Sequence, residues 1–565
     1  MNKVTANNLS TTVPIVTILI VWIMSLILLG FFQGLGYHFG FNVWPMGEDR
    51  NFLGFMLQAK GAKVAHEFWN MNDRNPMSIW WWILVSPIIK SFDCGLYIIR
   101  KCLDPFLAIA VFLLLDRLGR QQCRTFAFSV ALLVLTWNFS SYFEQVIWVY
   151  LGALGTSLLT IYFYCRYVDS NRRNSRDLAI ALILYLFTIT TYTLQPGAII
   201  AITFLAFFRV SNQAIKLTRW ERVCHPAWDV GFFAGIFLIY NMIWYTVSRN
   251  ADVFYVFNWS MFSKQFLQSI QHFFYHPAYH ALLKLTFADF SLLQIISIFF
   301  SAFLFSCFLF FIYPAKKILD SVQNIPLGWV VVIMLSIIVP IIILESTSSI
   351  WYPGSRSLMV QQVWQPLLYV SVIFLIVNLL PWCNSSAKHK TVLVLIALLN
   401  ACSFVMGLDY NHHLVLRTHY QQTLAEGIKK LNISPAESPF YLVRVARGND
   451  ADINTIRVYI SIYGQTMLHQ PVSLRVISNI PNPAHAPYWR TRFEKDTKGV
   501  MNAGPIGDKH PVPYSKLWII FFDGQKVWVP KVVHKEDFEG LQVDWERATS
   551  IDQHDKANQI KFRKS

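Results

Sequence analysis

The sequence predicts an all-α polytopic membrane domain of about 11 transmembrane helices, followed by an exported α/β or β-rich domain. Hydrophobic residues make up 54% of the 565 residues and charged residues only 14%, whereas soluble domains carry about 25% charged residues. Apolar runs near the length that crosses a bilayer recur along the chain. After residue 408 they give way to short β-like runs separated by loop signals, which predicts the second domain.

The first apolar run, 13–32, is too long for the core of a signal peptide, and no small-residue cleavage site follows it, so we expect a retained first helix. The other expected spans are 102–116, 125–139, 147–167, 177–193, 195–209, 228–248, 289–313, 327–345, 360–381 and 390–408. The segment MSIWWWILVSPII, residues 77–89, is short for a crossing. We expect it to lie at the membrane surface or to re-enter the membrane, anchored by its three tryptophans.

Basic loops between these spans predict the topology, because loops rich in Arg and Lys stay in the cytoplasm. They indicate a cytoplasmic N-terminus and an extracytoplasmic C-terminal domain, with connections 33–101, 140–146, 249–288 and 346–359 on the outer side. The formal net charge of +16 falls largely in short loops of this kind, which argues against a nucleic-acid partner. No evident organelle-targeting signal is present, which favours a bacterial inner membrane.

The sequence divides into a membrane domain, 1–408, and an exported domain, 409–565. Four β-like runs support the second domain: 440–445, 457–463, 473–478 and 516–522. Nothing in this tail has the pattern of a catalytic motif.

A charged cluster, GEDRNF (47–52), lies just past the first apolar run. Its connection, 33–101, is far longer than most connections in compact proteins. The segment after the acidic pair Glu48 and Asp49 has the spacing of an amphipathic helix lying along the membrane. Pro76 then opens an apolar, Trp-rich segment. These features favour a functional role for the pair over an ordinary solvated loop.

This order of elements resembles the membrane glycosyltransferases of the GT-C fold, a group that includes protein O-mannosyltransferases, lipid A aminoarabinose transferases and bacterial glycan-modifying glucosyltransferases. Their first outer loop commonly carries an Asp-Glu or similar pair and then a segment resembling His-Pro-Pro-Leu. The matching residues here are Glu48-Asp49, in reversed order, and Asn75-Pro76-Met77, without the His and one Pro. The stretch 96–120 is similar to the group's next helix. The resemblance covers the membrane region by layout and leaves out the tail.

The resemblance implies a sugar donor linked to polyprenyl phosphate and an acceptor glycan, lipid or protein at the outer face. A base must then take the acceptor's proton, and cations must stabilise the phosphate that leaves. A single base predicts inversion at the anomeric carbon. Asp49 is the first candidate for the base and Glu48 the second, since adjacent residues on a helix cannot both face one acceptor.

Two other outer connections carry candidates that the resemblance suggests. Glu144 lies where the group often has a further acid, although a Glu that caps a helix fits equally well. Tyr352 and Arg356 lie where the group places residues that approach the lipid phosphate, and Arg suits phosphate because its fork donates two hydrogen bonds. Both also fit as interface anchors. Gln195 lies where similar enzymes carry a Lys, so a phosphate role is doubtful for it.

Basic residues in the first outer loop run against the positive-inside trend. Arg50, Arg74 and Arg100 therefore indicate either phosphate contacts or a different topology at this loop.

No motif requires a cofactor, and the sequence leaves a divalent metal open. His272 and His276 have the helical spacing of a metal-binding pair, but an amphipathic surface helix is favoured because no carboxylate accompanies them. Asp104 and Asp116 flank a predicted span, where water is within reach, and are interpreted as structural.

Three other functions remain open. An O-antigen polymerase or ligase typically relies on a large late outer loop, whereas here the long loop is the first. A transporter or flippase should show paired half-chains or broken helices at matching positions, which this sequence lacks. A membrane assembly protein without chemistry would have replaceable outer acids.

Overall fold

The computed structural model divides into two compact units, a helical bundle within Met1–Phe41 and Ala65–Tyr410, and a second unit made of Asn42–Val64 and Asn411–Ser565. The described residues are 14–24, 26–27, 95–137, 147–170, 172, 174–191, 197–209, 220–247, 263, 266–267, 295–297, 299–304, 325–347, 360–381, 385–432, 440–445, 473–477, 490–494, 499–503, 512–513, 515–538, 543–546 and 550–563.

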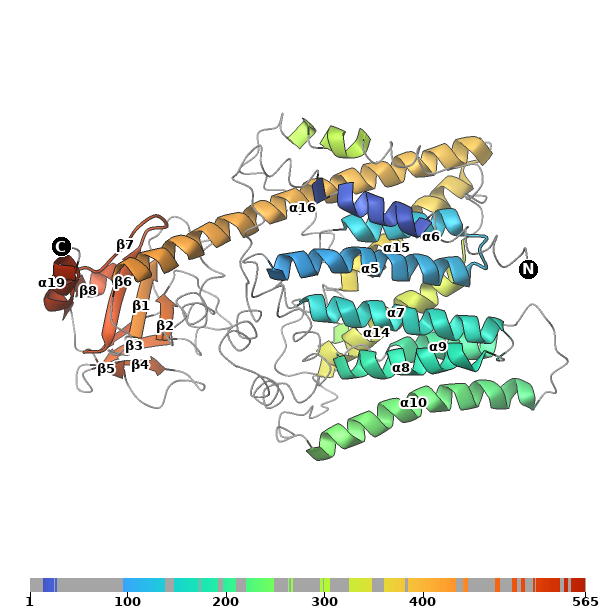
Figure 1. Cartoon of the computed structure of the whole chain (residues 1–565), viewed down its shortest axis with the longest axis horizontal. Coiled ribbons are helices and arrows are strands. Elements are labelled where there is room, and N and C mark those ends of the chain that lie inside the picture. The colour runs from blue at the N-terminus through green and yellow to red at the C-terminus, as the bar shows by residue number, and fades with distance from the viewer. Residues whose placement is uncertain are drawn as a thin grey trace. The chain divides into compact units, whose positions relative to one another are not determined.

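Long helices form the bundle, several of them side by side (Figure 1). They are α5 (Gly95–Leu118), α6 (Arg124–Thr136), α7 (Ile147–Asp169), α8 (Ser175–Thr191), α9 (Ala198–Phe208), α10 (Glu221–Val247), α14 (Leu327–Thr347), α15 (Gln361–Leu379) and α16 (Ser385–Lys430). Each contains or overlaps one span expected from the apolar runs. Residues 14–24 and parts of 295–304 are helical as well, within the first and eighth expected spans.

Aromatic side chains and small residues set how closely these helices pack. Phe233 of α10 is fully buried, and its ring meets the rings of Tyr164 and Tyr185 edge to face. At the start of α9, a Cβ added to Gly197 would lie 1.8 Å from the backbone oxygen of Ser336 in α14. Only glycine fits such an approach, so Gly197 sets the spacing between α9 and α14.

The outer faces of several helices are apolar and exposed, the reverse of a water-soluble bundle. On α10, Trp228, Met242 and Ile239 are each more than half exposed. Two helical segments, Val223–Ile243 and Gln362–Leu379, are long and apolar enough to cross a membrane, and other apolar helices among the described residues are shorter. These faces fit a lipid surround, while the count of eleven spans stays a prediction.

The C-terminal unit is a mixed α/β structure. One sheet has the strand order β2-β1-β6-β7, in which β1 (Phe440–Val445) pairs in parallel with both β2 (Ser473–Ile477) and β6 (Leu517–Phe522). Three of the predicted β-like runs are therefore strands, and the fourth, 457–463, lies outside the described residues. A second sheet has the order β5-β4-β3-β9, and a two-stranded sheet pairs β10 with β8.

The remaining strands and the last helix of this unit are short. They are β3 (Arg490–Glu494), β4 (Gly499–Ala503), β5 (Val512–Pro513), β7 (Val527–Trp528), β8 (Val532–His534), β9 (Val543–Glu546), β10 (Ser550–Asp552) and α19 (His554–Arg563).

The six residues of β6 are all buried, and a side chain completes the hydrogen bonding of one edge of this strand. The carboxamide of Gln553, itself 3% exposed, accepts from the backbone N–H of Ile519 at 2.9 Å and donates to the oxygen of the same residue at 3.2 Å. Because buried backbone groups need partners, Gln553 acts as a short substitute for a neighbouring strand.

Candidate functional site

The predicted site residues lie almost entirely outside the described part of the chain. Arg100 is described by its backbone alone, in the second turn of α5. The residues outside are Glu48, Asp49, Arg50, Arg74, Glu144, Gln195, His272, His276, Tyr352 and Arg356. Their roles stay predictions, and what the structure describes is the set of helices from which their connections start.

Three of those helices are joined by a buried polar contact at one end of the bundle. Gln362, in the first turn of α15, donates from its side-chain amide to Asp104 of α5 at 2.8 Å. The same nitrogen lies 3.4 Å from the backbone oxygen of Val134 in α6. Asp104 and Gln362 are 3% and 1% exposed. The expectation that water reaches Asp104 is therefore wrong, because α15 covers it.

A second contact repeats this link one turn further along α15. The indole N–H of Trp137, at the end of α6, donates to the side-chain oxygen of Gln365 at 2.9 Å. The rings of Trp137 and Tyr369 lie 5.5 Å apart. We call Asp104, Trp137, Gln362 and Gln365 the loop-root cluster, because each lies close to the end of a span predicted from the sequence, at a predicted outer connection. In the structure α5 begins earlier, at Gly95, so Asp104 lies more than two turns inside this helix.

The loop-root cluster therefore joins three helices that are each adjacent in sequence to a predicted outer connection. The connection before α5 is the one that carries Glu48 and Asp49, the one after α6 carries Glu144, and the one before α15 carries Arg356. A buried polar contact between apolar helices is costly unless it is satisfied, so such contacts mark a fixed arrangement or a functional one. Sequence reasoning missed Gln362 and Gln365, although two amides three residues apart in an apolar helix were a visible signal.

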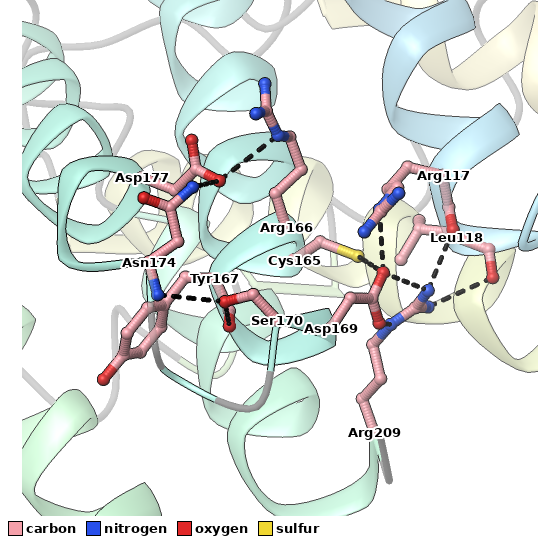
Figure 2. A network of polar contacts seen from close by, with 10 residues as sticks. All are labelled: Arg117, Leu118, Cys165, Arg166, Tyr167, Asp169, Ser170, Asn174, Asp177 and Arg209. Atoms are coloured by element: carbon pink, nitrogen blue, oxygen red, sulfur yellow. Dashed lines mark hydrogen bonds and ion pairs between the residues drawn. The ribbon is translucent and has the colours of Figure 1, made fainter. Parts of the chain in front are cut away.

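The opposite end of the bundle holds a denser network, which Figure 2 shows. Arg209, just past α9, is 2% exposed and forms a two-pronged pair with the carboxylate of Asp169 at 2.7 and 3.0 Å. Its other hydrogen bonds go to the backbone oxygens of Leu118 at 3.1 Å and Arg117 at 2.9 Å. Arg209 thus ties the last turn of α5, the last residue of α7 and the end of α9 together.

Two more arginines surround this centre. Arg117 lies 2.7 Å from the carboxylate of Asp169 through its Nε, and Arg166 lies 3.3 Å from the carboxylate of Asp177 through its Nε. Asn174 also donates to Asp177, at 2.7 Å. We call Arg117, Arg166, Asp169, Asp177 and Arg209 the arginine cluster.

Two further aspartates at this end are likewise paired. Arg172 donates to Asp229 at 3.0 Å, and the hydroxyl of Tyr164 donates to the same carboxylate at 2.9 Å. Asp116 pairs with Arg124 at 3.1 Å. The structural interpretation of Asp116 is therefore supported, although the residue is 4% exposed and the expected access of water is wrong.

The two ends differ in what they can do chemically. The arginine cluster balances each of its carboxylates with a guanidinium, which suits a structural role and anion contacts rather than proton transfer. The loop-root cluster combines a carboxyl group with amides beneath the predicted catalytic connections. Among the described residues, no three His, Cys, Asp or Glu side chains gather to hold a metal ion.

Comparison with known proteins gives structural neighbours only. No protein-family model and no curated protein matches the sequence. The oligosaccharyltransferase of Archaeoglobus fulgidus, in the apo form, is 12% identical with a TM-score of 0.37, over 83% of this chain and 65% of the other. ArnT from Cupriavidus metallidurans, in the apo state, is 12% identical with a TM-score of 0.36, over 83% of this chain and 86% of the other. The ArnT structure bound to undecaprenyl phosphate has a TM-score of 0.34.

Both neighbours are GT-C glycosyltransferases, the group that the sequence resembles. The chain spans about two thirds, 65%, of the archaeal enzyme's length.

Proposed function

We propose that this chain is an integral-membrane glycosyltransferase of the GT-C type. It transfers a sugar from a polyprenyl-phosphate donor to a glycan, lipid or protein acceptor at the extracytoplasmic face, with inversion. A bacterial inner membrane is the proposed location, with the N-terminus in the cytoplasm and the domain 409–565 outside.

The observation that carries this proposal is the loop-root cluster. Three connections that hold the candidate acids and the candidate phosphate ligands adjoin helices that are hydrogen-bonded to one another on that side of the bundle. Catalytic groups from separate segments must meet within hydrogen-bonding reach of one acceptor. Hydrogen bonds between these helices limit how far the three connections can separate. This restriction favours the approach of the catalytic groups to one acceptor.

In this mechanism Asp49 takes the proton from the acceptor hydroxyl as its oxygen attacks the anomeric carbon. The bond to the lipid phosphate breaks, and the phosphate leaves with its negative charge. Arg356, together with Arg50 and Arg74 of the first connection, stabilises that charge, for which the planar guanidinium fork is well suited. Glu48 and Glu144 orient the acceptor.

The test measures transfer of radiolabel from a panel of polyprenyl-phosphate sugars to membrane acceptors by the purified full-length protein. Asp49→Asn is expected to lower the rate by about 10²–10⁴-fold, the usual contribution of a positioned base. Asp93→Asn, the same change elsewhere in the same connection, serves as the matched control and is expected to keep the parent rate.

Two results would oppose the proposal. Transfer that survives both Asp49→Asn and Glu48→Gln would remove the acidic pair from the mechanism and direct attention to Glu144. A parent protein that transfers no sugar from any monophosphate donor, yet moves a glycan from a lipid diphosphate, would favour a polymerase or ligase.

A further inference from the structure

The two half-buried arginines of the arginine cluster are held in a way that leaves part of each guanidinium available. Arg117 and Arg166 contact the carboxylates of Asp169 and Asp177 through Nε, while their own side chains are 34% and 38% exposed. The structure records no hydrogen bond from their terminal nitrogens to any described residue. In Figure 2 the terminal nitrogens of Arg166 turn away from Asp177.

Arg209 shows the opposite arrangement at the same end of the bundle. Its side chain is 2% exposed, and its nitrogens bond to Asp169 and to two backbone oxygens. A guanidinium satisfied in this way serves the fold alone. Arg209 is therefore a structural residue. Arg117 and Arg166 are each oriented by an aspartate but keep terminal N–H donors that a ligand could use.

The two arginines lie on neighbouring helices, each in the last turn of its own helix. Arg117 and Arg166 both flank Asp169, because Arg117 contacts its carboxylate and Arg166 precedes it by three residues on α7. Residues three apart share one face of a helix. The rings of Tyr162 and Phe163 lie 5.7 and 5.4 Å from the Arg166 guanidinium carbon, which further restricts where that side chain can point.

The charge that this surface presents is positive, because its acids lie beneath its arginines. The carboxylates of Asp169 and Asp177 are 16% and 5% exposed, less than half the exposure of the arginines that cover them. Two guanidinium forks with free donors match the oxygens of a phosphate group, since each fork can donate two hydrogen bonds to it.

Aromatic side chains at the same end show which phosphate the surface would meet. Phe208, next to Arg209 in sequence, is 70% exposed, and Trp220, just before α10, is 76% exposed. Large aromatic residues collect where lipid tails meet the headgroups. Because Arg117 and Arg166 lie at the same end of the bundle as these residues, we expect their guanidiniums to lie at the level of lipid phosphates.

We propose that Arg117 and Arg166 form a binding site for the phosphate of an anionic phospholipid headgroup, at the end of the bundle opposite the loop-root cluster. The site is separate from the proposed transfer reaction and does not depend on it. From the predicted topology, the lipid belongs to the cytoplasmic leaflet.

The experiment measures lipid binding to the full-length protein in detergent, from the rise in its thermal unfolding midpoint with added ligand. The probes are dioctanoyl phosphatidylglycerol, dioctanoyl phosphatidylcholine and inorganic phosphate. We expect the anionic lipid to bind more tightly than the zwitterionic one. Arg166→Gln should raise the dissociation constant of the anionic lipid about tenfold or more, the effect of losing a hydrogen bond to a charged group.

Arg176→Gln is the matched control, because Arg176 is exposed at the same end and carries no aspartate contact in the structure. It removes the same charge and should change the dissociation constant less than about twofold. Arg117→Gln should act as Arg166→Gln does. If Arg117→Gln fails to fold, Arg166→Gln decides the matter, because Asp177 keeps its hydrogen bond from Asn174.

Three outcomes would overturn the proposal. Equal binding of the two lipids would remove the preference for an anionic headgroup. Equal losses in Arg176→Gln and Arg166→Gln would reduce the effect to general charge attraction. Inorganic phosphate that binds as tightly as the anionic lipid would make free phosphate the ligand.

Discussion

Replacing Arg209 by Gln should destabilise the helical bundle more than the same replacement of Arg117 or Arg166, the other two arginines of the arginine cluster. The change removes a two-pronged pair with Asp169 and two hydrogen bonds to the last carbonyls of α5. Breaking a buried ion pair costs about 3–5 kcal/mol. Because Arg117 still contacts Asp169 after the change, we expect the lower end, about 3 kcal/mol.

The assay is thermal unfolding of the purified protein in detergent, followed by tryptophan fluorescence. A loss of about 3 kcal/mol corresponds to a decrease of about 3–4 °C in the unfolding midpoint for a bundle of roughly 400 residues. Arg176→Gln, the exposed control, should stay within about 0.5 kcal/mol of the parent. The loss in Arg209→Gln should also persist from low to high salt, since ions screen buried pairs weakly.

A midpoint for Arg209→Gln that matches Arg176→Gln would refute this reasoning. It would mean that water or another donor takes over the role of the guanidinium at no cost. A loss that disappears in high salt would show instead that Arg209 contributes through long-range charge.

Three further predictions concern other parts of the chain. Gly197→Ala should lower the unfolding midpoint strongly, because its Cβ would overlap a backbone oxygen of α14, whereas Gly231→Ala, which has nothing within 4 Å of the new Cβ, should leave the midpoint unchanged or raise it slightly. Gln553→Ala should cost about 2 kcal/mol, because it leaves a buried N–H and a buried oxygen of β6 without partners, and hydrogen exchange at β6 should accelerate. Backbone N–H groups, first that of Gln525, lower the pKa of Asp523. The unfolded carboxyl therefore binds its proton at a higher pH than the folded one, so the stabilisation is present above the unfolded pKa and lost as the pH falls through the folded pKa. The difference in unfolding midpoint between parent and Asp523→Ala should accordingly shrink on acidification from pH 5, and a constant difference would contradict the hydrogen-bonding role.

The helices could be located from the sequence because an apolar run long enough to cross a bilayer has few structural alternatives to a helix. The run at 147–167 predicts α7, which ends two residues later, and the run 440–445 coincides with β1. The apolar stretch predicts a span that begins at residue 195, whereas α9 begins at residue 198. The difference arises because Pro196 and Gly197 do not interrupt the apolar composition of the stretch.

The contacts between helices could not be predicted from local sequence patterns, because they join residues far apart in the sequence. Arg209 and Arg117 meet although 92 positions separate them, and Gln362 meets Asp104 across 258. The basic loops were interpreted as markers of orientation, which explains the exposed arginines but not the buried aspartates that hold them. Acids such as Asp169 and Asp177 at the same helix ends were the available signal for that pairing.

The separation between the partners of Arg209 has a consequence for how the protein is made. Synthesis proceeds from the N-terminus, so Arg117 and Asp169 leave the ribosome well before Arg209 does. Until residue 209 follows, the last carbonyls of α5 lack their donor and Asp169 has only one of its two arginines. The contact of Arg117 with Asp169 can therefore form before α9 is made, and the ends of α5, α7 and α9 are joined together only once the nascent chain includes Arg209.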